Sequence, residues 1–346
     1  NDSVSSLVAA QSSAADTNVA ATAHAITAID LSKRKAFDAV RATLDYSPLV
    51  VDLIYVKIDA NVIGTGAATN RGPKDDVNLY AANFAYKFDT LNSEAEAYEI
   101  AKTDNADAVA TSSQVDKTYV YGLRGSVEPI SKLVLDGEIA LQTGNYADLL
   151  NNREISRRAW AADAGGAYAF DFKWSPKFAA RYSYRSGQKS ESSDANLDTT
   201  TTTTRYKAWS TMFEDQTHGI IANKIFDGDN DGVDSNSHII NVMASVVPLQ
   251  DLTVAVDYYH YALAEKWGSD GVSGSIFSGR YLNGGTGYEV TSKTELGDEV
   301  DLSLAYDYTE DVKLGLTAGW FLPGKTFLKD NNELASTIMA DVKVSF

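Results

Sequence analysis

The sequence predicts an all-β protein, a transmembrane antiparallel β-barrel with about 15–16 strands in this chain. Three observations lead to this fold class. Apolar and polar residues alternate along most of the chain, the connections between alternating segments are short and long in turn, and the last segment ends on an aromatic residue. Successive side chains of a strand point to opposite faces, so the alternation predicts strands with one apolar and one polar face.

Residues 300–308 show the alternation most clearly. Val300, Leu302 and Leu304 share one face, whereas Asp301 and Ser303 share the other. About fifteen segments follow this pattern, and most are near the ~9–11 residues with which a tilted strand crosses a bilayer. The sequence therefore predicts strands at 36–47, 50–61, 77–89, 93–103, 116–128, 131–144, 156–173, 176–187, 203–212, 217–226, 236–248, 251–264, 294–309, 311–322 and 333–346.

The connections alternate between short turns and long polar links, as the periplasmic turns and extracellular loops of outer-membrane barrels do. Pro48, Pro129, Pro176 and Pro248 lie at short turns, where a fixed φ and a missing N–H are tolerated. A soluble β-sandwich or propeller would also alternate, but the order of connections favours a membrane barrel. The glycine-rich stretch 268–287 is expected to be a long extracellular loop and a candidate constriction.

The last ten residues predict a closing strand that ends at the periplasm. Ile338, Val342 and the terminal Phe346 share one face of it. A C-terminal aromatic residue is the signal by which Gram-negative barrels are recognised for outer-membrane insertion, so we expect Phe346 to contact the barrel-assembly machinery. Counting strands back from this end places the link at 227–234 outside the cell and His218 at a periplasmic turn.

The same count makes strand 36–47 run inward, so residues 1–35 would begin outside. Single-chain bacterial barrels have an even number of strands with both ends in the periplasm. We therefore expect an odd number of strands upstream, giving about 18 in all. Residues 1–35 would then be the remnant of an extracellular loop, and 36–346 the transmembrane barrel. The alternative is that 22–30 forms the missing strand.

Composition excludes several classes of protein. The chain has 47 acidic and 30 basic residues, a formal net charge of −17, and no cysteine. A nucleic acid is not an expected partner because phosphate binding needs a basic surface. A disulfide scaffold and thiolate metal sites are excluded, and no run approaches the roughly 18 apolar residues of a membrane helix. The four histidines lack metal-ligand spacing and no Ser–His pair is evident, so no enzyme is predicted.

One motif indicates a metal. Asp227, Asp229 and Asp231 follow the spacing of a calcium loop, in which such positions and a following carbonyl supply oxygen ligands. The Val233 carbonyl would be the next ligand. The twelfth position should be a glutamate but is histidine, and Asp234 is the candidate substitute. Two interpretations of this extracellular loop stay open: a Ca²⁺ site, whose affinity would be weak, or a solvated Asp/Asn/Gly turn.

Several segments resemble the alginate-export family of outer-membrane barrels. They are R-K-A-F-D-A-V-R at 34–41, S-P-K-F-A-A-R-Y-S-Y-R-S-G-Q at 175–188, the segment 209–226 with Phe213 and His218–Gly219, and L-G-D-E-V-D-L to F-L-P-G within 296–324. The resemblance implies a monomeric barrel of about 18 strands that passes an anionic polysaccharide or related small anions passively. It also implies that the first strands of the family precede this chain.

Strand alternation also predicts which charges face the lumen. The candidates for the pore lining are Arg41, Lys57, Lys87, Arg124, Arg181, Arg185, Asp136, Glu138, Asp257, Asp301 and Asp307. By the same alternation Asp45, Asp59, Asp163 and Asp171 also face inward, so nine acidic residues accompany six basic ones. The residues therefore favour a pore more than they favour passage of a polyanion. The arginines are the best selectivity candidates because guanidinium groups fit carboxylates bidentately. The alternative is that these charges form cross-strand pairs that only stiffen the wall.

The sequence thus predicts a passive outer-membrane channel, or porin, for small hydrophilic or anionic solutes or saccharides. The alternative is a structural or partner-binding surface barrel plugged by its loops. The expected surroundings are outer-membrane lipid and lipopolysaccharide, with a small molecule or saccharide as the solute.

Overall fold

A computed structural model describes residues 38–59, 77–105, 115–148, 153–188, 205–212, 218–226, 233–267, 275–277, 288–327 and 332–345. Residues 1–37 lie outside these ranges, so the predicted loop remnant at 1–35 and the alternative strand at 22–30 stay predictions.

One sheet of 14 strands makes up most of the described chain, and consecutive strands of its main path pair antiparallel. This confirms the predicted all-β antiparallel architecture. The strands along the path are β1 (Asp38–Tyr46), β2 (Leu49–Asp59), β3 (Val77–Phe88), β4 (Ser93–Asp104), β5 (Asp116–Ile130), β6 (Leu133–Asp148), β7 (Arg153–Ala169), β8 (Lys177–Arg185), β10 (Ser237–Leu249), β11 (Leu252–Leu263), β14 (Glu295–Asp307), β15 (Val312–Pro323) and β16 (Ala335–Val344).

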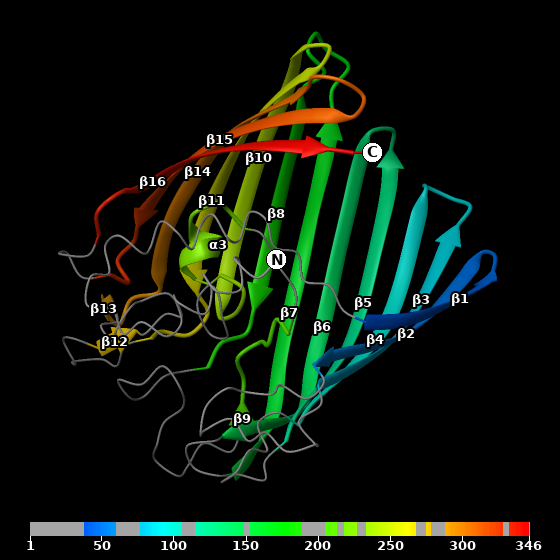
Figure 1. Ribbon diagram of the computed structural model, residues 1–346, viewed down its shortest axis with the longest axis vertical. Helices are drawn as coiled ribbons and strands as arrows, with labels where there is room; N and C mark the ends of the chain where they lie inside the picture. Colours follow the sequence, from blue (N-terminus) through cyan, green and yellow to red (C-terminus); the bar gives the residue numbers. More distant parts are fainter. Residues whose placement is uncertain are drawn as a thin grey trace.

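Three further strands are short. β9 (Arg205–Tyr206) pairs parallel with β7, and β12 (Ser275–Phe277) forms a two-stranded sheet with β13 (Tyr288–Val290). A single turn of helix, α3 (Ala222–Ile225), lies on the concave side of the strongly curved main sheet, as Figure 1 shows. No helix in the described part of the chain has the length and apolar character needed to cross a membrane.

The predicted membrane strands at 203–212 and 217–226 are wrong. Only the two residues of β9 and the helix α3 form regular structure in the described parts of these segments. Gly219 adopts a φ of +75°, in the left-handed region that interrupts a strand. The apolar residues of these segments are buried against the concave side of the sheet instead of facing lipid. Removing two strands leaves the direction of every other strand as predicted.

The two ends of the sheet differ. Short turns join β1 to β2, β3 to β4, β5 to β6, β7 to β8, β10 to β11 and β14 to β15 at one end, which we call the short-turn end. The remaining connections start from the opposite end, which we call the long-link end. This is the predicted order of connections, and in Figure 1 the short turns lie along the top and the right of the view.

The convex face of the sheet carries large apolar side chains that are exposed. Val40, Leu123 and Ile338 are 69%, 61% and 75% exposed. Such an extensive apolar surface is incompatible with contact with water alone and is typical of the lipid-facing band of a membrane barrel. Aromatic residues flank this band near both ends, as membrane interfaces favour. They include Phe88, Phe172, Trp174 and Tyr308 near the short turns and Tyr55, Tyr80, Tyr121, Trp160 and Trp320 toward the long links.

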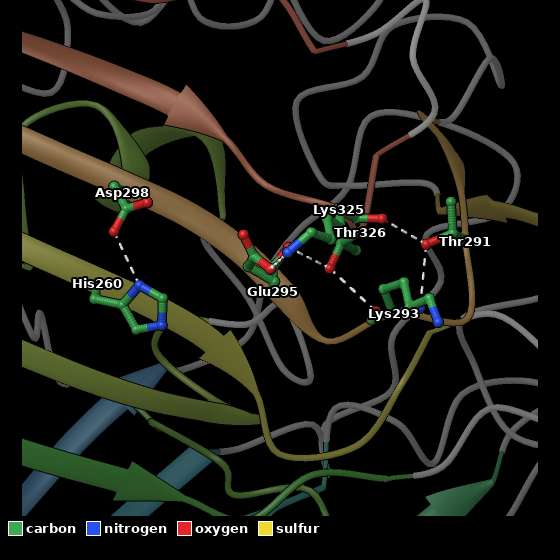
Figure 2. A network of polar contacts seen from close by, with 7 residues as sticks. All are labelled: His260, Thr291, Lys293, Glu295, Asp298, Lys325 and Thr326. Atoms are coloured by element: carbon green, nitrogen blue, oxygen red, sulfur yellow. Dashed lines mark hydrogen bonds and ion pairs between the residues drawn. The ribbon is translucent and has the colours of Figure 1, made fainter.

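Polar contacts fasten the long-link end of β14 and β15 together (Figure 2). The Nζ of Lys325 lies 2.5 Å from Oε2 of Glu295, and the hydroxyl of buried Thr326 donates to the carbonyls of Lys293 and Glu295. The hydroxyl of Thr291 donates to the carbonyl of Lys325 at 2.6 Å. These bonds hold the segment before β14 against the segment after β15, and so give this part of the rim a defined shape.

Candidate functional site

A segment of the chain between β8 and β10 lies inside the curved sheet. We call residues 206–212 and 218–226 the luminal segment; the side chain of Arg205, the other residue of β9, lies on the opposite face of the sheet. At its start, Tyr206 stacks on Tyr146 of β6, with ring centroids 3.9 Å apart, and both rings lie within 6 Å of the guanidinium carbon of Arg157. Arg157 is buried and pairs with Asp116 of β5 at 2.8 Å. The segment is therefore anchored to the concave faces of β5–β7 from its first residues.

Trp209 extends this anchor. Its indole packs against Val120, Ala140 and Ala159, which come from three adjacent strands. The next residue, Ser210, forms two hydrogen bonds with the side chain of buried Gln142: Nε2 donates to the Ser210 carbonyl at 2.6 Å, and the Ser210 N–H donates to Oε1 at 2.9 Å. A glutamine amide satisfies both backbone groups of one residue in this way, so the polar chain can be buried against the wall.

The far part of the luminal segment is anchored to the opposite wall by two carboxylates of β14. Buried Glu299 accepts hydrogen bonds from the backbone N–H groups of Ile221 at 2.7 Å and Ala222 at 2.8 Å. Asp301 accepts one from the N–H of Ile220 at 3.1 Å. A buried backbone donor without an acceptor costs about 1–3 kcal/mol, so these contacts hold the segment at this position.

Position 219, which directly precedes the residues held by Glu299 and Asp301, requires glycine. A Cβ at Gly219 would lie 2.5 Å from the Tyr261 hydroxyl and 2.6 Å from Oε2 of Glu299, and its φ is +75°. Any larger residue would meet both the strain of a left-handed backbone and these polar atoms. The hydroxyl of Tyr261 donates to the carbonyl of His218 at 3.0 Å, which adds a bond from β11.

Apolar packing completes the second anchor. Phe226 is 1% exposed and contacts the rings of Trp267, Phe321 and Phe327. The same cluster includes Ile221, Ala222 and Leu296. The described parts of the luminal segment therefore reach from the wall of β5–β7 to the wall of β11, β14 and β15.

A cavity of about 280 Å³ lies between the luminal segment and the wall of β4–β8. Trp209 and His218 line it from the luminal segment, and Arg181 and Arg185 from β8; Tyr98, Glu138, Ala140, Ala161, Ala162, Asp163 and Tyr184 complete the lining. The cavity is thus bounded by both positive and negative side chains together with aromatic rings.

Each charged side chain of the cavity has a polar partner. Arg181 bonds Asp136 at 2.6 Å and also Asp163, which in turn accepts from Ser183. Arg185 lies 3.2 Å from Nε2 of His218. Burial lowers the pKa of His218 to about 3, and the positive charges of Arg185 and Arg181 act in the same direction. His218 is therefore neutral at neutral pH, and it lies inside the sheet, not at the predicted periplasmic turn.

The structure places most of the predicted pore-lining residues on the concave face. Arg41 bonds Asp52 at 2.8 and 2.7 Å, Arg124 bonds Glu96 at 3.0 and 2.6 Å, and Asp307 pairs with Lys313 at 2.8 Å. Also on this face are Lys87 beside Glu94, Glu138 with the Tyr98 hydroxyl, Asp257 near Asn241, and Asp301. Many of these charged residues therefore form pairs between neighbouring strands.

The prediction that Lys57 faces the lumen is wrong. Its register partners are Asp38 and Asn78, and it shares a face with Tyr55, whose hydroxyl donates to Asn78. That face carries the exposed apolar residues of β2, so Lys57 lies on the convex side and does not line the lumen. The shift of register between Lys57 and Asp59 occurs at the end of the strand and does not change its face.

The residues of the predicted calcium loop are only partly described. Asp227, Asp229 and Asp231 fall in a gap of the described chain, as does most of the stretch 268–287 predicted as a constriction. Val233 and Asp234 are buried, and the Val233 carbonyl accepts a hydrogen bond from the Ser237 hydroxyl at 2.9 Å. No group of three potential metal ligands occurs within the ranges that the structure covers.

A curved antiparallel sheet with an apolar convex face, aromatic belts and a charged concave face defines an outer-membrane β-barrel of the channel class. The particular family is also clear. The chain belongs to the alginate-export family, whose model, described as "Alginate export", matches residues 21–341. The matching family is one of export proteins and not of enzymes.

Solved structures of other barrels are similar at low identity. The NanC porin is 8% identical, with 79% of this chain and 95% of that chain covered and a TM-score of 0.34. The siderophore receptor PirA from Acinetobacter baumannii is 10% identical, with 91% and 56% covered and a TM-score of 0.39. The toluene transporter TodX from P. putida is 8% identical, with 82% and 75% covered and a TM-score of 0.28. Among curated proteins, none matches significantly.

Proposed function

We propose that this protein is a passive outer-membrane channel for small hydrophilic or anionic solutes or saccharides, and that the luminal segment narrows its route. The observation that carries the proposal is the cavity beside that segment, where Arg181 and Arg185 of the wall face Trp209 and His218. An open space lined by arginines and an aromatic ring suits a hydroxylated or carboxylated solute.

The balance of charge in this cavity argues for small solutes over a long polyanion. With His218 neutral, the formal charges of Arg181 and Arg185 are matched by those of Glu138 and Asp163. A mixed constriction offers hydrogen bonds to hydroxyl groups of either orientation. A chain with many carboxylates would meet repulsion from the acidic side of the same space.

Conductance in planar bilayers tests the proposal. We expect the wild type to form ohmic channels, and replacement of both arginines in Arg181→Gln/Arg185→Gln to shift the reversal potential in a KCl gradient toward cation preference. Lys87→Gln, a change on the concave face near the short turns, is the matched control and should shift it less. Absence of conductance from a correctly folded barrel would rule out the channel.

The extent of the luminal segment favours one alternative, a plugged structural or partner-binding barrel. Its described parts are fixed at two opposite walls by buried polar contacts. Deletion of residues 207–226 distinguishes the two functions. A channel conducts before the deletion and conducts more after it, whereas a plugged barrel conducts only after it.

A further inference from the structure

Three basic side chains lie together on the convex, lipid-facing side of the sheet at the long-link end. Lys117 of β5, Asn145 of β6, Ser156 of β7 and Arg205 of β9 are successive register partners across neighbouring strands. Arg158 lies on the same face of β7, two residues from Ser156. The row spans three strand spacings, about 14 Å at the ~4.8 Å between neighbouring strands.

The face that these residues occupy is fixed by their neighbours. Arg157 and Tyr206, which alternate with Arg158 and Arg205, are buried on the concave side with the guanidinium over the ring. Arg158 and Arg205 are exposed, as the opposite face requires. Figure 1 shows β9 beside the end of β7 that lies away from the short turns.

The cations sit directly beyond the aromatic belt. Along the convex face of β7, Arg158 is followed toward the short-turn end by Trp160, and along β5 Lys117 is followed by Tyr119, Tyr121 and Leu123. Tyr121, Trp160 and Leu123 are among the large exposed apolar residues. Aromatic belts mark the level of the lipid headgroups, so the cations are at the height of headgroups and not of acyl chains.

These cations lack the acidic partners that arginines of the concave face have. Arg41, Arg124, Arg157 and Arg181 each bond a carboxylate. Within the described residues, by contrast, Lys117, Arg158 and Arg205 form no ion pair. The nearby carboxylates are Glu154, which accepts from Asn145 Nδ2 at 2.7 Å, and Glu99, the register partner of Tyr121. A basic group left unpaired in a chain of net charge −17 indicates an external anion.

We propose that Lys117, Arg158 and Arg205 form a binding site for the phosphorylated headgroup of an outer-leaflet lipid. Guanidinium groups bind phosphate bidentately, and basic clusters next to an apolar membrane band bind anionic headgroups. The width of the row accommodates a headgroup with more than one phosphate. This inference rests on the placement of the protein in the outer membrane and is independent of whether it conducts.

Native mass spectrometry of the full chain in detergent tests the site, with bisphosphorylated and dephosphorylated lipid A as probes. We expect the wild type to retain the bisphosphorylated form at least about tenfold better, and Arg158→Gln/Arg205→Gln to lose this preference. The control Lys173→Gln/Lys177→Gln removes two exposed positive charges at the short-turn end and should retain it. Heat-modifiable migration on gels establishes that each variant is folded.

Three outcomes would overturn the proposal. The double arginine variant could retain the bisphosphorylated lipid as well as the wild type does. The control variant could lose it equally, which would indicate a general effect of net charge. Millimolar inorganic phosphate could displace the lipid from the wild type completely, which would assign the site to a free anion. This experiment measures lipid binding and not conductance. A negative result would therefore overturn the lipid site without bearing on the channel proposal.

Discussion

The carboxylate of Glu299 accepts a hydrogen bond at 2.7 Å from the backbone N–H of Ile221, 78 positions away along the chain. This bond joins a membrane-spanning strand to the luminal segment. Glu299 is 0% exposed, and it accepts a second bond from Ala222. Since the contact uses backbone groups of the segment, it depends on the wall residue and on the path of the chain more than on the side chains of residues 221 and 222.

Glu299→Gln is therefore expected to release the luminal segment. The amide that replaces the carboxylate places an NH₂ group where one acceptor oxygen faced a backbone donor, and a buried unmatched donor costs about 1–3 kcal/mol. That cost corresponds to roughly a five- to 150-fold shift toward the released state. Single-channel recordings should show larger or more frequent openings. Glu295→Gln, on the same strand but at the rim contact with Lys325, should leave the recordings unchanged.

Gly219→Ala is expected to displace the same segment through sterics. The added methyl group would lie 2.5 Å from the Tyr261 hydroxyl at a backbone φ of +75°. We expect a loss of about 1–3 kcal/mol in the docking of the segment, seen as faster proteolysis of residues 213–226 in the folded barrel. Gly137→Ala is the matched control, because the atom nearest to its Cβ is 3.4 Å away, an ordinary contact. Equal proteolysis of the two variants would contradict the role of Gly219.

The sequence located the membrane strands because their alternation reflects a local rule that each strand obeys on its own. The predicted segments at 251–264 and 294–309 match β11 and β14 to within a few residues. The luminal segment could not be predicted in the same way. Its apolar residues, such as Trp209 and Phe226, are buried by strands that are remote in sequence, and a short apolar run is compatible with a strand or with a buried connection.

In the candidate site, too, the sequence predicts what local alternation determines but not the contacts between segments remote in sequence. Alternation placed Asp301 on the concave face, and Glu299 lies on that face by the same rule, yet no local signal shows that its carboxylate meets a backbone. Lys57 was assigned to the wrong face because both faces of β2 carry apolar residues, so alternation alone does not show which of them is luminal. Arg157 was overlooked because its partners, Asp116, Tyr146 and Tyr206, come from three separate strands.

Acid is expected to weaken the docking of the luminal segment through His218. Its pKa in the docked state is lowered from 6.5 to about 3 by burial and by Arg185 and Arg181. A released His218 binds a proton below about pH 6.5, whereas the docked one does not until about pH 3. The docked state therefore loses stability as the pH falls through this window. Glu299 and Asp301 of β14 also face the segment, so their contribution to the pH dependence has to be separated from that of His218.

The measurement is the open probability between pH 7 and pH 5, the range in which a released histidine becomes protonated. The wild type should open more at pH 5, and His218→Gln should show a reduced dependence on pH while Glu299 and Asp301 stay in place. A pH dependence that is unchanged in His218→Gln would mean that carboxylates, and not the imidazole, control the segment.

Calcium is expected to order the extracellular link between α3 and β10 without changing conduction. The prediction rests on Asp227, Asp229 and Asp231 in the sequence, and the structure bears on the last ligand position. His238, which stands where a calcium loop has its glutamate, lies on the convex face with Nδ1 2.7 Å from the Tyr182 hydroxyl. Because this contact occupies its Nδ1, a bound ion would depend on the aspartates, with Asp234 as the substitute ligand. Extracellular calcium modules bind in the range of about 10⁻⁴–10⁻³ M, and we expect an affinity of this order.

Limited proteolysis in the presence of millimolar Ca²⁺ checks this expectation. Cleavage within 227–232 should slow severalfold in the wild type, and Asp227→Asn/Asp229→Asn should abolish the protection. Mg²⁺ at the same concentration is the control, because it prefers water to such a flexible site. Single-channel conductance should be the same with and without Ca²⁺, since the loop precedes β10 at the long-link end and the cavity beside Arg181 is lined by other residues. Protection that persists in the double variant would indicate that the aspartates do not bind Ca²⁺ and form a solvated turn.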